Sequence, residues 1–127
     1  MPVLNFKKRF APDVESGKKR QTVRAMRKRP FKYSDRLYLY EGARTKKCRK
    51  LGEADVISVE DISILSNGSA FLSGKMLKLF HLDEIARRDG FGNWFEMWNW
   101  FQDVHGLPFE GQLIRWGSLI KEGLRNG

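Results

Sequence analysis

The sequence predicts a small α+β domain in which about five or six strands form a curved sheet or small barrel, flanked by short helices. Three observations lead to this prediction. Residues 20–72 are rich in β-branched and aromatic residues at a spacing of two, which is typical of half-buried strands. The last third spaces its apolar residues three and four apart, as a helix does. The 127 residues, 41% of them hydrophobic, suffice for one core.

Six segments alternate in the way that strands do. In residues 36–42, Leu37 and Leu39 alternate with Tyr38 and Tyr40, so this strand has an aliphatic face and a phenolic face. The six segments are 3–6, 20–26, 36–42, 53–65, 70–72 and 109–116. We expect one domain over residues 1–116 and a mobile C-terminal tail over residues 117–127.

Three short helices complete the predicted domain. The first contains Phe10 and Val14 and ends at Gly17, and the second covers residues 81–90. The third follows Asn93, a good N-cap residue, and buries a stripe of apolar side chains. The stripe consists of Trp94, Met97, Trp98, Phe101 and Val104. Phe95 and Trp100 lie off the stripe, which makes them the better candidates for stacking on a base.

Positive charge is concentrated in the first half of the chain. Residues 1–50 hold 17 of the 24 Lys and Arg but four of the 15 Asp and Glu, and the whole chain carries +9. This asymmetry predicts a positive face that attracts polyanions. We therefore expect nucleic acid as the partner. The alternative is that the basic residues form a solvated face that binds no partner. A membrane is not expected, because no basic run adjoins a wide apolar helical face.

The chain shows no pattern for a metal, a cofactor or secretion. Cys48 is the one cysteine, and His81 and His105 lack partners at ligand spacing, so we expect no metal site. The glycine-rich segments 68–75 and 90–95 depart from the nucleotide-binding motifs, so we expect no cofactor. No run reaches the length of a membrane span and the N-terminus lacks a secretory pattern, so we expect a cytoplasmic protein.

The segment "GKKRQTVR" at residues 17–24 has three interpretations. Lys18, Lys19, Arg20 and Arg24 would lower the pKa of one lysine among them, which could then activate the Thr22 hydroxyl as a nucleophile. Alternatively, a face carrying Arg20, Thr22 and Arg24 could hold a phosphate or a base edge without bond breaking. The third interpretation is an exposed basic strand with no site.

Basic and aromatic side chains elsewhere extend the predicted nucleic-acid surface. Residues 27–29 and the loop 42–52 are basic, and Tyr38 and Tyr40 lie between them in sequence, an interleaving that single-stranded nucleic acid favours. The residues expected to contact nucleic acid are Lys18, Lys19, Arg20, Arg24, Arg27, Lys28, Arg29, Tyr38, Tyr40, Arg44, Lys46 and Arg49.

Four segments together resemble the ASCH domain, a branch of the PUA-like superfamily. They are "VESGKKRQTVR" at 14–24, "YSDRLYLYEG" at 33–42, "DGFGNWFEMWNWF" at 89–101 and "FEGQLIRW" at 109–116. The order and spacing are similar along residues 3–116, and the chain also resembles the small ASCH proteins of phages and prophages. The resemblance implies a small PUA-like β-barrel with flanking helices, and a cleft beside the first helix and the second strand that binds RNA or a nucleobase.

Some ASCH proteins are acetylcytidine amidohydrolases, which use a lysine and a threonine of this first segment with a later glutamate. The resemblance therefore implies Lys19 as base and Thr22 as nucleophile. The later acid departs from the family pattern, because Asp89 stands before "GF" and Glu96 lies further along.

We expect a nucleic-acid-binding module, with RNA as the first choice. The alternatives are an amidohydrolase of acylated cytidine, an RNA-strand nuclease, and a protein that binds another protein through its basic face. The sequence predicts no oligomeric state.

Overall fold

Seven strands and three helices make up residues 2–120, which are the residues that the computed structural model describes. In chain order they are β1 (Val3–Phe6), α1 (Ala11–Ser16), β2 (Gln21–Ala25), β3 (Arg36–Glu41), β4 (Arg49–Ile64), β5 (Ala70–Leu72), β6 (Lys75–Met76), α2 (Leu79–Arg88), α3 (Trp94–Val104) and β7 (Phe109–Trp116). The prediction of a small α+β domain is confirmed. The seventh strand, which the sequence did not predict, is the two-residue β6.

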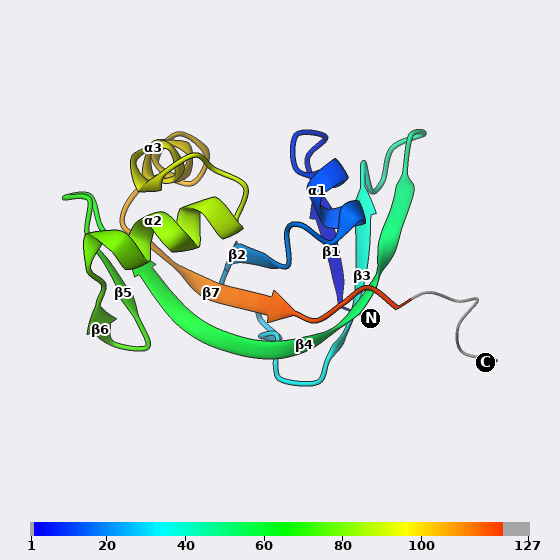
Figure 1. The fold of residues 1–127 in the computed structure, drawn as a ribbon, viewed down its shortest axis with the longest axis horizontal. Helices are drawn as coiled ribbons and strands as arrows, with labels where there is room; N and C mark the ends of the chain where they lie inside the picture. The colour runs from blue at the N-terminus through cyan, green and yellow to red at the C-terminus, as the bar shows by residue number, and fades with distance from the viewer. Residues whose placement is uncertain (1, 121–127) are drawn as a thin grey trace.

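The 16-residue strand β4 organises the sheet. Its first half, residues 49–55, pairs antiparallel with β3, and its second half pairs antiparallel with β7. Strand β1 adds parallel to β3, β2 adds antiparallel to β7, and β5 pairs with the end of β4. Figure 1 shows that β4 curves along its length, with the helices inside the curve.

The sheet does not close into a barrel. Within residues 2–120, no backbone pairing joins β1 to β2, so these two strands remain edges of an open mixed sheet. A side chain bridges the two strands instead: Nη2 of Arg24 on β2 donates to the carbonyl oxygen of Asn5 on β1, at 2.8 Å. The curved sheet is therefore as predicted, whereas the closed barrel is not observed.

The core lies between the curved sheet and the helices. Alternate residues of β3 and β4, such as Leu37 and Ile62, belong to one buried apolar cluster that also includes Met97 and Phe101 of α3. Asn93 caps α3 as predicted, since its Oδ1 accepts from the backbone N–H of Glu96 at 2.9 Å. Among the described residues, no helix is long and apolar enough to cross a membrane.

Two segments differ from the sequence prediction. Residues 49–52 were predicted as part of a loop but open β4, where Arg49 and Lys50 pair with β3 and Arg49 forms ion pairs with Glu15 and Glu41. The tail was predicted to be mobile from residue 117, yet the backbone N–H groups of Gly117 and Ile120 donate to β4 at 3.1 and 2.8 Å. The rest of the predicted tail, residues 121–127, lies outside the described residues.

Strands β7 and β2 approach each other closely at Gly111, and this contact supports a stability prediction. A Cβ on Gly111 would lie 2.1 Å from the carbonyl oxygen of Arg24 and 2.8 Å from the ring of Phe109. Gly111→Ala must therefore push β2 away from β7, and we expect it to cost at least about 1–3 kcal/mol of unfolding free energy, measured by urea denaturation. The control is Gly117→Ala, where the nearest atom lies 3.7 Å away. Equal stabilities of the two variants would contradict the prediction.

Candidate functional site

A pocket of about 300 Å³ lies where β1 and β2 meet the C-terminal ends of α2 and α3. Fourteen residues line it, and they include three of the four residues predicted as catalytic. The lining residues are Asn5, Phe6, Lys7, Phe10, Lys19, Thr22, Val23, Arg24, Asp89, Phe91, Trp100, Phe101, Val104 and His105. The volume is at the lower end of the range for small-molecule sites, which suits one nucleobase or nucleoside.

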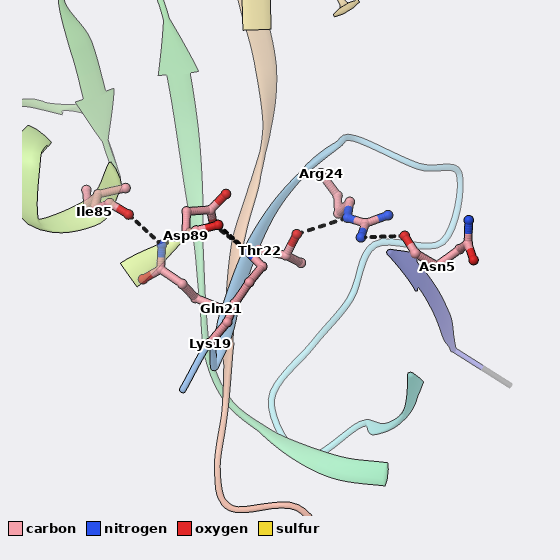
Figure 2. A network of polar contacts seen from close by, with 7 residues as sticks. All are labelled: Asn5, Lys19, Gln21, Thr22, Arg24, Ile85 and Asp89. Atoms are coloured by element: carbon pink, nitrogen blue, oxygen red, sulfur yellow. Dashed lines mark hydrogen bonds and ion pairs between the residues drawn. The ribbon is translucent and has the colours of Figure 1, made fainter. Parts of the chain in front are cut away.

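A buried polar network forms one side of the pocket (Figure 2). The ammonium of Lys19 donates to the carbonyl oxygen of Asp89 at 2.5 Å and lies 3.4 Å from its carboxylate Oδ1. The amide of Gln21 donates to the same Oδ1 at 3.2 Å and to the carbonyl oxygen of Ile85 at 3.0 Å. The three residues at the centre, Lys19, Gln21 and Asp89, are each at most 5% exposed. The network therefore ties β2 to the end of α2 and holds Lys19 in place.

The turn between α1 and β2 aims Lys19 inward. Helix α1 ends at Gly17, whose φ of 83° is left-handed and favours glycine, and whose N–H donates to the carbonyl oxygen of Val14. The N–H of Lys19 then donates to the carbonyl oxygen of Asp13 at 2.9 Å. These two bonds fix the backbone just before β2 begins, so Lys19 enters the pocket while its neighbours Lys18 and Arg20 are exposed.

Thr22 and Arg24 form a second polar group on β2. Because they are two residues apart on a strand, their side chains share one face. Nε of Arg24 donates to Oγ1 of Thr22 at 3.0 Å, and Nη2 reaches Asn5 (Figure 2). A guanidinium has five N–H donors, so donors remain for a ligand. The predicted pairing of Thr22 with Arg24 on one face is observed.

Aromatic rings line the same pocket beside this network. Phe10 and Phe91 meet edge to face at 5.4 Å between ring centroids, and Trp100 lies 5.8 Å from Phe91. Cations lie over these rings, with Nζ of Lys19 5.1 Å from the centroid of Phe10 and Nζ of Lys7 5.3 Å from that of Trp100. A planar ligand would thus meet π-faces together with positive charge, a combination that binds bases and their phosphates.

Burial changes the acid–base properties of the pocket. Desolvation lowers the pKa of Lys19 below its ordinary value, although Asp89 opposes the shift. Desolvation also lowers the pKa of Arg24. The pKa of His105 is lowered by desolvation and by the charges of Arg24 and Lys7, so its imidazole is neutral at neutral pH and has one donor and one acceptor.

The other predicted catalytic acid lies elsewhere. Glu96 does not line the pocket; on the exposed face of α3 its carboxylate pairs with Arg9 at 2.5 Å and accepts from the N–H of Gly92 at 3.1 Å. Of the two acids considered from sequence, Asp89 is the one in contact with Lys19. Its short side chain reaches because the end of α2 packs directly against β2.

Lys18 and Arg20 are separated from Lys19 and Arg24. They line a different hollow, together with Arg88 and Arg115. The predicted face of Arg20, Thr22 and Arg24 is therefore not continuous, because β2 begins only at Gln21 and Arg20 belongs to the preceding turn.

The remaining predicted contacts are spread over other surfaces. Residues 27–29 are exposed and line another hollow beside Phe31, whose ring lies 4.5 Å from the Arg27 guanidinium. Lys50 lies over the ring of Tyr38 at 5.7 Å, and neither Tyr38 nor Tyr40 lines the main pocket. Arg44 and Lys46 are exposed in the loop before β4, and Arg49 forms its ion pairs at the start of that strand.

Several pocket residues were not identified from the sequence as site residues. Asn5, Phe6 and Lys7 come from β1 and the turn after it, while Phe91 and His105 follow α2 and α3. Trp100 was predicted for stacking because it departs from the apolar stripe, and it does line the pocket. No comparable signal marks Lys7 or His105, whose positions depend on how β1 and α3 pack around β2.

Within residues 2–120, no three His, Cys, Asp or Glu side chains gather as metal ligands do. No family model matches this chain, and neither does any curated protein or solved structure.

The Lys19–Asp89 pair supports a prediction about stability. Removing one partner leaves a buried unpaired charge, so Lys19→Met and Asp89→Leu should each cost about 3–5 kcal/mol in urea unfolding. The double variant Lys19→Met/Asp89→Leu removes both charges and should lose much less than the two single variants together. Additive losses would contradict a direct interaction.

The same pair predicts a pH dependence. The pKa of Lys19 is lowered on folding. At pH values between the lowered pKa of the folded state and the ordinary pKa of 10.5, the unfolded chain therefore binds more protons than the folded chain. Unfolding free energy should therefore rise with pH across that window relative to the double variant, which lacks the group. A falling difference would contradict the lowered pKa.

Proposed function

We propose that this protein is a single-stranded RNA-binding module of the ASCH type, which takes one base into the pocket between β1, β2 and α3. The observation that carries the proposal is the composition of that pocket: the rings of Phe10, Phe91 and Trp100 face cations. Neutral His105 and Thr22 add hydrogen-bonding groups for a base edge.

The open sheet bears on the family assignment. A closed barrel requires continuous backbone pairing, whereas here the Arg24–Asn5 hydrogen bond connects β1 and β2 without it. The PUA-like architecture, which the resemblance implies, and a cytoplasmic location are parts of this proposal. The positive balance of residues 1–50 supplies the long-range attraction for a polyanion.

Binding should depend on salt and on Trp100. Trp100→Ala removes one stacking ring and should weaken the affinity for a labelled single-stranded RNA about 5- to 150-fold, corresponding to roughly 1–3 kcal/mol per stacked base. The matched control is Phe95→Ala, an exposed ring on the same helix that does not line this pocket.

Fluorescence anisotropy across a salt series measures both effects, and circular dichroism confirms that each variant is folded. Lys7→Gln, which leaves the ring in place, should flatten the slope of log affinity against log salt by about 0.7. Salt-independent binding, or no binding at low salt, would contradict the proposal. If DNA of the same sequence binds more tightly than the RNA, the protein is still a nucleic-acid-binding module, but its ligand is DNA.

A second candidate function is hydrolysis of an acylated cytidine. The observation in its favour is that Lys19, Thr22 and Asp89 line one pocket and that the pKa of Lys19 is lowered. Thr22 Oγ1 would attack the acyl carbonyl as Lys19 takes the hydroxyl proton. The C–N bond breaks, the amine of cytidine leaves with a proton, and water then releases the acyl group. The N–H of Arg24 already donates to Thr22 Oγ1, which favours negative charge on that oxygen.

Thr22→Ala tests this candidate. If the protein is an amidohydrolase, this variant should lose release of acetate from N4-acetylcytidine while still binding the nucleoside, because the walls of the pocket are unchanged. Thr22→Ser, which keeps a hydroxyl, should retain measurable turnover. Liquid chromatography of the products provides the measurement, and unchanged turnover in Thr22→Ala would dismiss Thr22 as nucleophile.

A further inference from the structure

A second hollow, of about 340 Å³, lies next to the main pocket and contains four cations. Lys18, Arg20, Arg88 and Arg115 line it with the apolar side chains of Ile57 and Trp116. Arg88 and Arg115 come from α2 and β7, which the sequence did not connect with the basic segment. The described residues that line this hollow include no acidic side chain.

The charges of this hollow are incompletely compensated. The ammonium of Lys18 has no ion pair within residues 2–120, and Arg20 is held by a hydrogen bond from its Nε to the carbonyl oxygen of Gly17 at 2.9 Å. Arg88 pairs with Glu84 at 2.8 Å, on the exposed side of α2. Two of the four cations thus face the hollow without a carboxylate partner.

Arg115 gives an independent indication that the hollow binds an anion. Its Nε is buried and donates to no acceptor among the described residues, and its Nη1 lies 3.9 Å from the nearest carboxylate oxygen, on Glu60. A buried donor of a charged group without an acceptor is costly. The side chain as a whole is 28% exposed, so an anion in the hollow would compensate the charge of the guanidinium.

The hollow and the main pocket are formed by the same two segments. In the turn before β2, Lys18 and Arg20 line the hollow while Lys19 lines the pocket; at the end of α2, Arg88 lines the hollow while Asp89 lines the pocket. Because successive residues of an extended segment point to opposite sides, and consecutive Cα atoms are about 3.8 Å apart, the two sites lie back to back across this one segment. A strand with one base in the pocket therefore reaches the hollow by passing around this segment, which places a phosphate near Lys18 and Arg20.

We propose that this hollow binds a backbone phosphate of the nucleic-acid strand whose base occupies the main pocket. This inference rests on the proposed RNA-binding function and deepens it, because it makes a polynucleotide, rather than a free nucleoside, the ligand. A nucleoside has no phosphate to fill the hollow, whereas a strand joins both sites.

Charge removal in the hollow provides the test. Lys18→Gln is the cleaner variant, because Lys18 is exposed and its loss releases no carboxylate; Arg88→Gln is the second. The matched control is Arg87→Gln, which removes an exposed arginine from the neighbouring position of α2 but lines neither site. All variants carry the same net charge, so a general electrostatic effect affects them equally.

Affinities for a labelled single-stranded RNA across a salt series, and for cytidine by calorimetry, give the readouts. We expect Lys18→Gln and Arg88→Gln each to lower the salt slope for RNA by about 0.7 relative to Arg87→Gln, and to leave cytidine affinity unchanged. If wild-type protein binds RNA and all three variants have the same slope, the phosphate site is wrong and the RNA-binding proposal stands. If wild-type protein does not bind RNA, both are wrong.

Discussion

The ammonium of Lys19 is buried at 3% exposure, and a buried charge is tolerated only when it is paired and hydrogen bonded. Asp89 meets both requirements through its carboxylate and its carbonyl oxygen. Since these residues lie 70 positions apart, their contact joins the first third of the chain to the end of α2. The hydrogen bonds of Gln21 strengthen this contact between β2 and the end of α2. Together these interactions hold the two elements side by side, and the pocket forms beside them.

The long curved strand β4 makes that contact geometrically feasible. Its first half carries β3 and β1, and its second half carries β7 and β2, so the curve brings β1 and β2 toward each other across the pocket. Arg24 and Asn5 then connect the two edges by a side chain. Because the edges do not pair through their backbones, the space between them stays available to a ligand.

Local patterns predicted the elements well, and long-range packing accounts for most of the rest. Alternation predicted β3 and the greater part of β4, and Asn93 marked the start of α3 correctly. The pairing of Lys19 with Asp89 rather than a role for Glu96 could not be predicted, because nothing in a sequence pattern states which helix end reaches β2. Whether the sheet closes depends on the distance between β1 and β2, which packing sets and local patterns do not show. Arg20 does not share the face of Thr22 and Arg24 because β2 begins only at Gln21.

The proposed function requires that a base enter the pocket beside Trp100. Two-dimensional NMR of the nitrogen-15-labelled protein tests it directly, because the indole N–H groups of the four tryptophans give separate signals. A Trp100→Phe variant assigns the signal of Trp100. On titration with single-stranded RNA, we expect this signal to shift more than those of Trp94 and Trp98, which line neither the pocket nor the second hollow. If the Trp100 signal does not move at saturating RNA, no base enters this pocket.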